Sequence, residues 1–462
     1  MVFIRASRKD GYMVCRRTLL TAITGIALSA GLCHGGDSSA VQLKIKPSGF
    51  ASMEFGEIVK GGVNSKSNLA MDNTWIKNLI AGLSVSAALS DRNSLAIGME
   101  MQMYNDFPIT SALLTYPEFR YLYFYPYFSR AEYAHLFGDV KNPYLTLSAG
   151  YFPFKYNSDV KNLGEYLFRT GTYPQYIFND FDFPLARLLG FHASLTPHIP
   201  SNDLKIDVIA YSNLQWYAVG DWNLAFVASD RVADFIDVGL GVTLNSILSA
   251  DSAVTTPHNP ATLYHVTYNA PTGVSDSSFY TFRGAKLMAR AAIDFKKFIP
   301  CELLGKQDLR FYGEATILGL TDYPKNQLGG VSYDSILERI PVMAGFNVPM
   351  FKLLDVLSVE VEYFKCPFPN DVGALTNYGL PIPGSVNATG ATNYWGISEY
   401  RYDKWKWSVY ASKKIATNYT IMAQAASDHL RPLAVNDKNV DFEEIFHNTN
   451  QWYYMLKCTA GF

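Results

Sequence analysis

The chain ends on a segment in which apolar and mixed positions alternate, and this alternation constrains the fold more than any other feature. Counting back by twos from Phe462 gives an almost wholly apolar set: Ala460, Cys458, Leu456, Tyr454 and Trp452. The positions between them are Gly461, Thr459, Lys457, Met455 and Tyr453. A period of two predicts a β-strand with one apolar and one mixed face. Such an ending is unusual for a soluble domain, whose chain ends are commonly frayed and polar.

The same alternation recurs along the chain. It is clearest in residues 95–103, 236–245, 286–295, 309–317 and 357–363. In residues 309–317, for example, Leu309, Phe311, Gly313, Ala315 and Ile317 lie opposite Arg310, Tyr312, Glu314 and Thr316. A single such segment fits a half-buried soluble strand equally well. The set, with Tyr and Trp near the strand ends, indicates membrane-barrel strands of about ten residues with alternating faces.

The connections between these segments alternate between short turns and long loops, which is the plan of an outer-membrane barrel with periplasmic turns and external loops. We therefore predict an all-β fold, a closed antiparallel transmembrane β-barrel of about 16 strands, with 14 to 18 left open. An even count favours reading 394–412 as one strand, because splitting it would place a long loop on the turn side. The predicted strands are 49–60, 75–89, 94–105, 119–137, 143–153, 186–198, 203–213, 222–228, 234–248, 278–299, 308–320, 338–350, 355–365, 394–412, 418–428 and 450–462.

The N-terminal residues have the order of a secretory signal. Arg16-Arg17 precede an apolar run from Thr18 to Leu32, and small and polar residues follow. We predict a signal peptide over residues 1–36, with Met13 as an alternative start, and a single barrel domain over 37–462. Two alternatives are a lipid anchor at Cys33, which Leu32 disfavours, and an anchor helix, for which the run is short of the ~20 residues needed.

Composition excludes several classes of function. Charged residues make up 17% of the chain and the formal net charge is -2; typical globular domains carry ~25% charged residues. A balance near zero predicts no nucleic-acid partner. The mature cysteines Cys301, Cys366 and Cys458 are odd in number and far apart, so we predict no disulfide framework, metal or cofactor. The eight histidines lie in no recognisable catalytic motif, so we predict no enzyme.

Two segments resemble bacterial outer-membrane proteins. The ending at Phe462 resembles the closing strand of these barrels, which implies recognition by the barrel-assembly machinery and a site in outer-membrane lipid. Residues 147–174 are similar to the region of phosphate-selective-type porins where a strand leads into an inward-folding third loop. Pro153 and Phe154 follow Phe152 directly, which departs from that spacing, so anion selectivity is not carried over. The resemblance leaves a homotrimer open.

Loop 154–185 is the third external loop by parity, and in general porins that loop narrows the pore. Its candidate constriction charges are Lys155, Asp159, Lys161, Glu165 and Arg169. The alternative is a solvated outer loop. Six charges fall on the mixed face of predicted strands, where they are candidates for the lumen wall: Arg290, Asp294, Arg310, Glu314, Glu360 and Glu362. Rings of charge set ion selectivity in channels, but opposed charges on neighbouring strands also pair to stiffen a wall.

About sixteen strands leave a water-filled lumen, whereas about eight fill their own interior. The sequence therefore predicts a porin-like channel for passive diffusion of small hydrophilic solutes or ions. The alternative is a surface-exposed binding or adhesion barrel with a blocked lumen, which would hold a polysaccharide or partner through loops 249–277 and 366–393. Trp395 and the Tyr-rich loops favour that alternative, because aromatic rings stack on sugars. A transporter of hydrophobic substrates would need an apolar lumen, and the mixed faces are polar.

Overall fold

The computed structural model describes part of the chain from Lys44 onward, within the compact unit Lys44–Phe462. The predicted signal, 1–36, lies outside this part, so its cleavage stays a prediction. The described residues are 44–61, 63–64, 69–70, 72–105, 122–170, 173–174, 186–197, 203–212, 220–248, 264–269, 274–279, 284–320, 336–365, 405–427 and 449–462.

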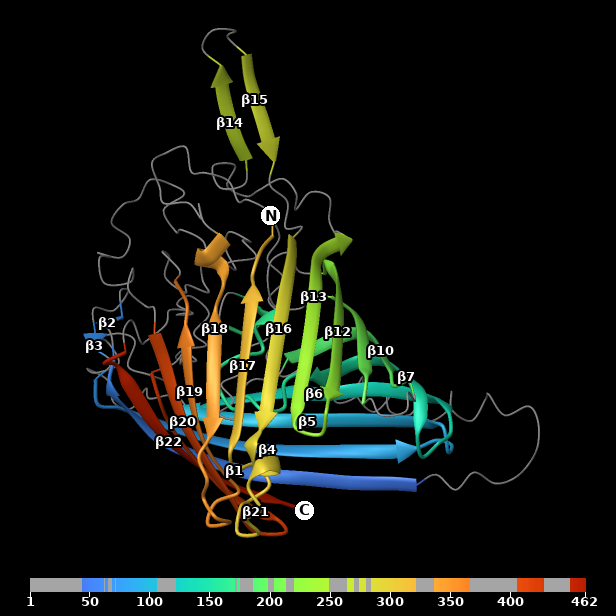
Figure 1. Cartoon of the computed structure of the whole chain (residues 1–462), viewed down its shortest axis with the longest axis vertical. Helices are drawn as coiled ribbons and strands as arrows, with labels where there is room; N and C mark the ends of the chain where they lie inside the picture. Colours follow the sequence, from blue (N-terminus) through green and yellow to red (C-terminus); the bar gives the residue numbers. More distant parts are fainter. Residues whose placement is uncertain are drawn as a thin grey trace, which may run out of the picture. The chain divides into compact units, whose positions relative to one another are not determined.

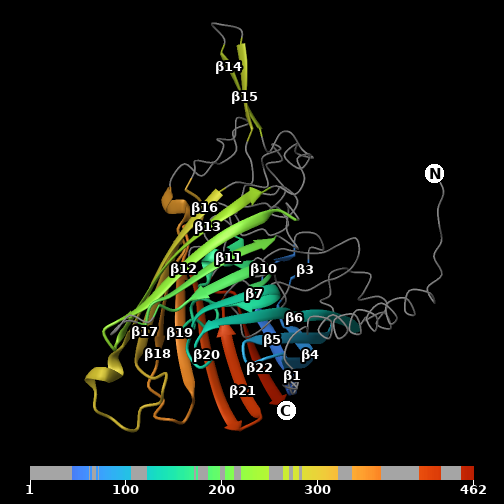
Figure 2. The same cartoon turned by 90° about the vertical axis from the view of Figure 1, so that its right-hand side faces the viewer.

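Within these residues, sixteen antiparallel strands form a closed barrel (Figures 1 and 2). Each strand pairs with its neighbours in chain order, and the last strand pairs with the first. The barrel strands are β1 (Lys44–Lys60), β4 (Thr74–Ala88), β5 (Asn93–Asn105), β6 (Leu122–Gly138), β7 (Pro143–Phe154), β10 (Ala186–Leu195), β11 (Lys205–Ser212), β12 (Trp222–Val232), β13 (Ile236–Leu248), β16 (Gly284–Asp294), β17 (Arg310–Ile317), β18 (Val342–Asn347), β19 (Val356–Tyr363), β20 (Trp405–Ala416), β21 (Tyr419–Ala426) and β22 (Trp452–Gly461).

Short elements lie in the connections. Three two-stranded sheets pair β2 (Val63–Asn64) with β3 (Leu69–Ala70), β8 (Arg169–Thr170) with β9 (Tyr173–Pro174), and β14 (Tyr264–Asn269) with β15 (Val274–Phe279). The 3₁₀ turns are η2 (Tyr166–Phe168), η4 (Phe295–Phe298) and η5 (Ile336–Arg339). Among the described residues no helix is long and apolar enough to cross a membrane. Cys301 and Cys458 are free thiols, and Cys366 lies outside the described part.

The predicted all-β closed barrel is confirmed, and each predicted strand corresponds to one barrel strand. Some boundaries were wrong. β12 runs to Val232, through the turn expected from residue 229, because its backbone continues to pair with β13. β16 ends at Asp294, whose side chain caps η4, although the alternation continues through Phe295. β20 extends to Ala416, beyond the predicted end at residue 412, and the predicted start at 394 lies outside the described residues. Among the described strands of the barrel, β20 alone lies between β19 and β21, as parity required.

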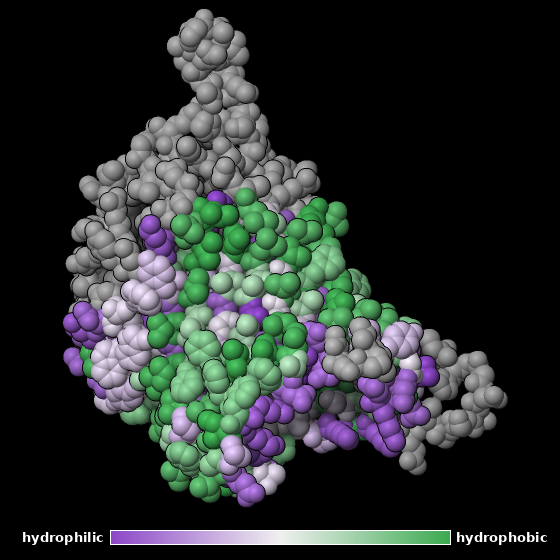
Figure 3. All heavy atoms as spheres, viewed as in Figure 1, coloured by the Kyte–Doolittle hydropathy of each residue, from purple (hydrophilic) through white to green (hydrophobic). Residues whose placement is uncertain are grey.

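Side-chain exposure separates the two faces of the wall. Large apolar residues on the outward phase are exposed, among them Leu240, Leu287, Phe311, Val361 and Leu456. Figure 3 shows hydrophobic side chains gathered on the outer surface over β13, β16, β17 and β18. The alternate positions are buried and largely polar, as with Glu314 in β17 and Glu360 in β19. An apolar outer face this extensive is typical of a barrel surrounded by lipid.

The seam between β1 and β22 closes the barrel. Gly49 and Phe462 exchange two backbone hydrogen bonds, of 3.1 and 2.9 Å. Further along the seam, Glu54 of β1 and Lys457 of β22 are register partners, and their side chains form a buried ion pair of 3.3 Å. The Asn78 amide of β4 donates to the same carboxylate at 2.9 Å. Charge neutralisation on the inner face thus joins three successive strands around the closure.

We expect Lys457→Met to destabilise the barrel, because it removes a buried ion pair of the Glu54 carboxylate. Removing one partner of a buried pair commonly costs about 3 kcal/mol or more. The measurement is the urea concentration at the midpoint of unfolding in detergent. Unfolding is monitored in electrophoresis by the loss of the heat-modifiable band. Lys141→Met, in an exposed turn, is the matched control. An unchanged midpoint for Lys457→Met would contradict a structural role for this pair.

Candidate functional site: a segment folded inside the barrel

Residues 155–168, here called the inner segment, follow β7 and are held against the inner face of the barrel. From residue 156 onward almost all of their side chains are buried. Their η2 turn packs against β13, β16 and β17. Their hydrogen-bond partners are inward-facing side chains of β17 and β19, more than 140 positions later in the chain. The segment therefore lines the inner wall along strands that neighbour one another from β7 to β19.

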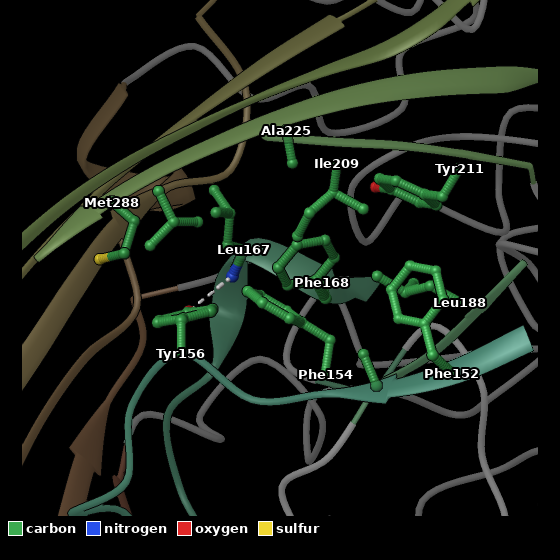
Figure 4. Packing of buried hydrophobic residues seen from close by; sticks show 12 residues of the cluster. Phe152, Phe154, Tyr156, Leu167, Phe168, Leu188, Ile209, Tyr211, Ala225 and Met288 are labelled. Carbon is green, nitrogen blue, oxygen red and sulfur yellow. Dashed lines mark hydrogen bonds between the residues drawn. The ribbon is translucent and has the colours of Figure 1, made fainter. Parts of the chain in front are cut away.

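An apolar cluster fixes both ends of the inner segment. Phe152 and Phe154 at the end of β7 pack with Leu167 and Phe168 of η2. Figure 4 shows these side chains facing Leu188, Ile209, Tyr211 and Ala225 of β10 to β12. Val227 of β12 belongs to the same cluster. Full burial of an aromatic or aliphatic side chain stabilises by about 1.5–3 kcal/mol. The Phe-Pro-Phe sequence thus supplies the apolar anchor from which the segment turns inward.

The Glu360 carboxylate of β19 holds the middle of the inner segment. It accepts three consecutive backbone N–H groups: Lys161 at 2.6 Å, Asn162 at 2.9 Å and Leu163 at 2.8 Å. The Tyr312 hydroxyl donates to it as well, at 2.7 Å. Glu360 is fully buried. A carboxylate that receives several N–H donors in a water-poor site forms strong, charge-assisted hydrogen bonds, so this contact sets how far the segment reaches across the wall.

The Glu314 carboxylate of β17 holds the two ends of the segment together. It accepts from the Tyr156 hydroxyl at 2.6 Å, from the Asn157 amide at 2.9 Å and from the Tyr166 backbone N–H at 2.9 Å. The Tyr156 hydroxyl accepts from the Leu167 N–H at 3.0 Å, the dashed bond in Figure 4. Tyr166 in turn donates its hydroxyl to Glu362 of β19.

Alternating acidic and basic side chains join the inner segment to β17, β13 and β12. Asp159 receives two hydrogen bonds from the Arg310 guanidinium, one of them at 2.8 Å. Arg310 also contacts Asp237 of β13, and Asp237 accepts from Arg231 of β12 at 2.8 Å. Asp159 is buried, so its charge is balanced by the fork of one arginine rather than by water. The ion pair makes the turn at residues 158–160 part of the wall.

The tight turn before η2 adopts a conformation that few residues tolerate. Gly164 has φ of 97°, and a Cβ there would lie 2.8 Å from Val160 Cγ1. Glu165 follows with φ of 58° and a buried side chain that accepts from the Asn157 backbone N–H. Burial and the neighbouring Glu314 carboxylate raise the pKa of the Glu165 carboxyl to about 8. Positive φ at a non-glycine residue persists only when surrounding contacts require it.

The predicted constriction residues therefore occupy different environments. Asp159 and Glu165 are buried within the inner segment, whereas Lys155 is exposed and Lys161 is partly exposed. Arg169 begins β8, and its side chain lies outside the described part. The structure brings Asp159, Lys161 and Glu165 together with four of the wall charges: Arg310, Glu314, Glu360 and Glu362. Their role in narrowing a pore stays a prediction.

The two other wall candidates lie next to the inner segment's anchors in the sheet, because Arg290 is the register partner of Glu314 and Asp294 that of Arg310. Arg290 of β16 is partly exposed on the inward phase. Asp294 ends β16 and accepts from the Lys296 N–H at 3.1 Å, which places it at the turn rather than in the middle of the wall. The sequence reading missed the anchoring role of Tyr156, Asn157 and Tyr166. The period of two places Tyr312 and Ser358 on the inward face of the wall together with Glu360. This shared face was the sequence signal that could have indicated the polar site around Glu360.

Polar side chains on the opposite half of the wall are also buried. They lie on β1, β4, β5 and β20 to β22, and comprise Glu54, Asn78, Gln102, Lys406, Gln424 and Lys457. Within the described part, no group of His, Cys, Asp and Glu side chains could hold a metal ion. The inner face is thus a hydrogen-bonded polar surface with the inner segment attached to one half of it.

Comparisons with known proteins give structural likeness alone. No family description matches the chain, and no curated protein matches it. Among solved structures, Salmonella typhi OmpF, in a complex with daunomycin, has a TM-score of 0.47 and 9% identity, covering 91% of this chain and 98% of that one. OprB of Pseudomonas putida, in a high-pH structure, gives 0.45 and 10%, covering 90% and 94%. A mutant Rhodopseudomonas blastica porin gives 0.40 and 9%, covering 91% and 100%.

We expect Glu360→Gln to loosen the middle of the inner segment. Glutamine lacks the negative charge of the carboxylate, and its amide nitrogen cannot accept a hydrogen bond, so it cannot hold all three backbone N–H groups. Charge-assisted hydrogen bonds contribute about 1.5–3 kcal/mol, so the amides of residues 161–163 should exchange roughly tenfold faster or more. Hydrogen–deuterium exchange with mass spectrometry measures this. Glu132→Gln, on β6, is the matched control. Equal protection of these amides in Glu360→Gln and the control would contradict the proposed anchor.

Stability should depend on the ionisation of Glu165. Its folded pKa of about 8 lies above the usual 4.5. The neutral carboxyl therefore favours the folded state below about pH 4.5, and this contribution is lost as the pH rises through about 8. The thermal midpoint of the wild type, relative to that of Glu165→Gln, should fall between about pH 5 and pH 9. Circular dichroism melting checks this, with the exposed Glu302→Gln as control; parallel profiles for wild type and Glu165→Gln would contradict it.

Proposed function

We propose that this chain is a porin-like channel of the bacterial outer membrane that lets small hydrophilic solutes or ions diffuse passively. A closed barrel of sixteen strands with an apolar outer face and a polar inner face supports this reading. Barrels of 16–18 strands enclose an aqueous lumen. The proposed activity is passive diffusion, which requires neither a cofactor nor an enzymatic reaction.

The observation that carries the proposal is the inner segment on the lumen wall. Its anchoring carboxylates, Glu314, Glu360 and Glu362, are buried and hydrogen-bonded to it. Such a rigid partial filling narrows a wide lumen to a size that discriminates solutes without closing it. We assign the narrowest zone to the exposed edge of this segment, where Lys155 and Lys161 lie.

The orientation follows from the connections. The short turns after β4, β6, β12 and β20 lie at the same end of the barrel, which we assign to the periplasm. With this assignment we expect the longer connections, including 249–283 and 364–404, to face the exterior. Phe462 pairs with Gly49 at the periplasmic end of the seam and remains largely exposed, as a signal read by the barrel-assembly machinery would be. The expected homotrimer is a further proposal, which native mass spectrometry of the purified barrel tests.

A second candidate function is a surface-binding or adhesion barrel with a blocked lumen. The observation in its favour is the burial of charged inner-face residues on the other half of the wall, such as Glu54, Lys406 and Lys457. An open aqueous lumen would leave many such side chains exposed to water. In this reading the long external connections bind a polysaccharide or a partner, and nothing diffuses through.

We expect the refolded protein to form ion-conducting channels in planar bilayers, and deletion of 158–172 to raise the single-channel conductance about twofold or more. The deletion removes the part of the chain attached to the inner wall, so the lumen widens. Each variant is first checked for a folded, heat-modifiable barrel. A deletion of equal length within 366–393 is the control and should leave the conductance within about a quarter of wild type.

Two results would count against the proposal in different ways. A folded barrel that shows no conductance would overturn the channel function and favour the blocked, surface-binding barrel. Conductance that is unaffected by the deletion would keep the channel but contradict the assignment of the constriction to the inner segment.

A further inference from the structure

Acidic and basic side chains differ in their exposure on the inner face of the barrel. In the described part, the acidic groups of ion pairs on this face are shielded: Asp159, Asp207, Glu132 and Asp237 have side-chain exposures of 5, 4, 10 and 16%. Their basic partners fall into two groups: Arg130, Lys205 and Arg231 are 44, 45 and 50% exposed, whereas Arg310 and His192 are 15 and 16% exposed. The exposed Asp203, 3.9 Å from Arg231, lies in the turn before β11. Apart from Asp203, the members of these pairs that are most exposed to water are therefore cationic.

The inner segment shows the same division over a few residues. Glu165 is buried, and a carboxyl with a pKa of about 8 is largely neutral at pH 7. Asp159 is buried against Arg310. The two lysines of the segment instead reach its water-facing side, with Lys155 exposed and Lys161 partly exposed. The edge of the segment that borders the lumen thus carries positive charge.

The two lysine ammonium groups are close to each other and held in place. Lys155 Nζ donates to the Val160 carbonyl at 2.8 Å, and Lys161 Nζ donates to the Ser158 carbonyl at 3.3 Å. Both carbonyls belong to the turn that Arg310 and Asp159 fix to the wall. Burial is the largest cause that lowers the pKa of Lys161; the neighbouring Lys155 charge lowers it further, while Glu360 and Asp159 raise it. A small anion near both lysines would relieve the repulsion between them.

We propose that Lys155 and Lys161 give the channel a preference for small anions, such as halides, phosphate and short carboxylates. This inference rests on the proposed channel function and deepens it by naming the solute class. It comes from the exposure of individual side chains. The formal net charge of the whole chain, -2, points to no preference, because the acidic groups act as buried acceptors and ion-pair partners.

The two lysine charges act more strongly on a passing ion than buried charges do, because they lie closer to it. A unit charge about 6 Å from a passing ion in water changes the local ion concentration about threefold at room temperature, and the effect declines over a Debye length of about 10 Å at 0.1 M salt. The buried carboxylates lie behind hydrogen-bond donors and arginine, and the two lysines stand at the edge. Lysine is a compact charge with no fixed fork, which suits transient contact with anions of different shape.

The test is the reversal potential of single channels in planar bilayers under a tenfold KCl gradient. The wild type should be more permeable to chloride than to potassium. In the double variant Lys155→Gln/Lys161→Gln the chloride-to-potassium permeability ratio should fall about threefold or more, since both near charges are removed. Lys155→Arg/Lys161→Arg should keep the wild-type sign. Lys297→Gln, which removes an exposed charge from the turn after β16, is the matched control and should leave the ratio unchanged.

Three results would overturn the inference. Wild-type channels that favour potassium, or a double glutamine variant with the wild-type ratio, would exclude these lysines as selectivity residues while the channel function stands. A folded barrel without conductance would overturn the proposed function and this inference together. Glutamine removes the charge and keeps an N–H donor on a slightly shorter side chain. Loss of folding would show as loss of the heat-modifiable band, which separates it from a change in selectivity.

Discussion

Backbone hydrogen bonding is the constraint on which the rest of this structure depends. A sheet within lipid has no water to satisfy the polar groups at its edges, so it is stable only when it closes on itself. The pairing of β1 with β22 meets that requirement, and it continues to the last residue, where Phe462 and Gly49 exchange backbone hydrogen bonds. Closure also determines where each side chain points. Every second residue then faces lipid, and the remaining ones share an enclosed interior.

That relation explains why the strands could be predicted from the sequence. A lipid face and a polar face produce alternation in the chain itself, and turn chemistry and parity then give the number of strands. The errors occurred where alternation and backbone pairing differ. Ile293 and Phe295 continue the period of two. The strand nevertheless ends at Asp294, whose side chain caps the 3₁₀ turn η4 that begins at Phe295. At Val232 the backbone continues to pair beyond the residues that a turn pattern suggested.

The candidate site could be predicted only in part, for a physical reason. Parity and the Phe-Pro-Phe segment indicate which loop folds inward, and alternation indicates which charges face the lumen. Which of these charges meet is decided by contacts across the barrel, such as that of Glu360 with the Leu163 amide, 197 positions apart in the chain. One sequence carries no information on such pairing. The sequence therefore identified Glu314 and Glu360 as wall charges that either pair with neighbouring strands or face the solute, but it did not indicate that they hold the inner segment.

The use of carboxylates as anchors has a consequence for the electrostatics of the interior. A loop inside a barrel exposes backbone and side-chain donors that need acceptors. Glu360 accepts three backbone N–H groups of the inner segment, and Glu314 accepts one backbone N–H and two side-chain donors of it. Each carboxylate used in this way is withdrawn from water, whereas Lys155 of the same segment is exposed and Lys161 is partly exposed. In the proposed channel, the inner segment therefore presents its positive charges to the solute. Charge selectivity would then follow from how the inner segment is held to the wall.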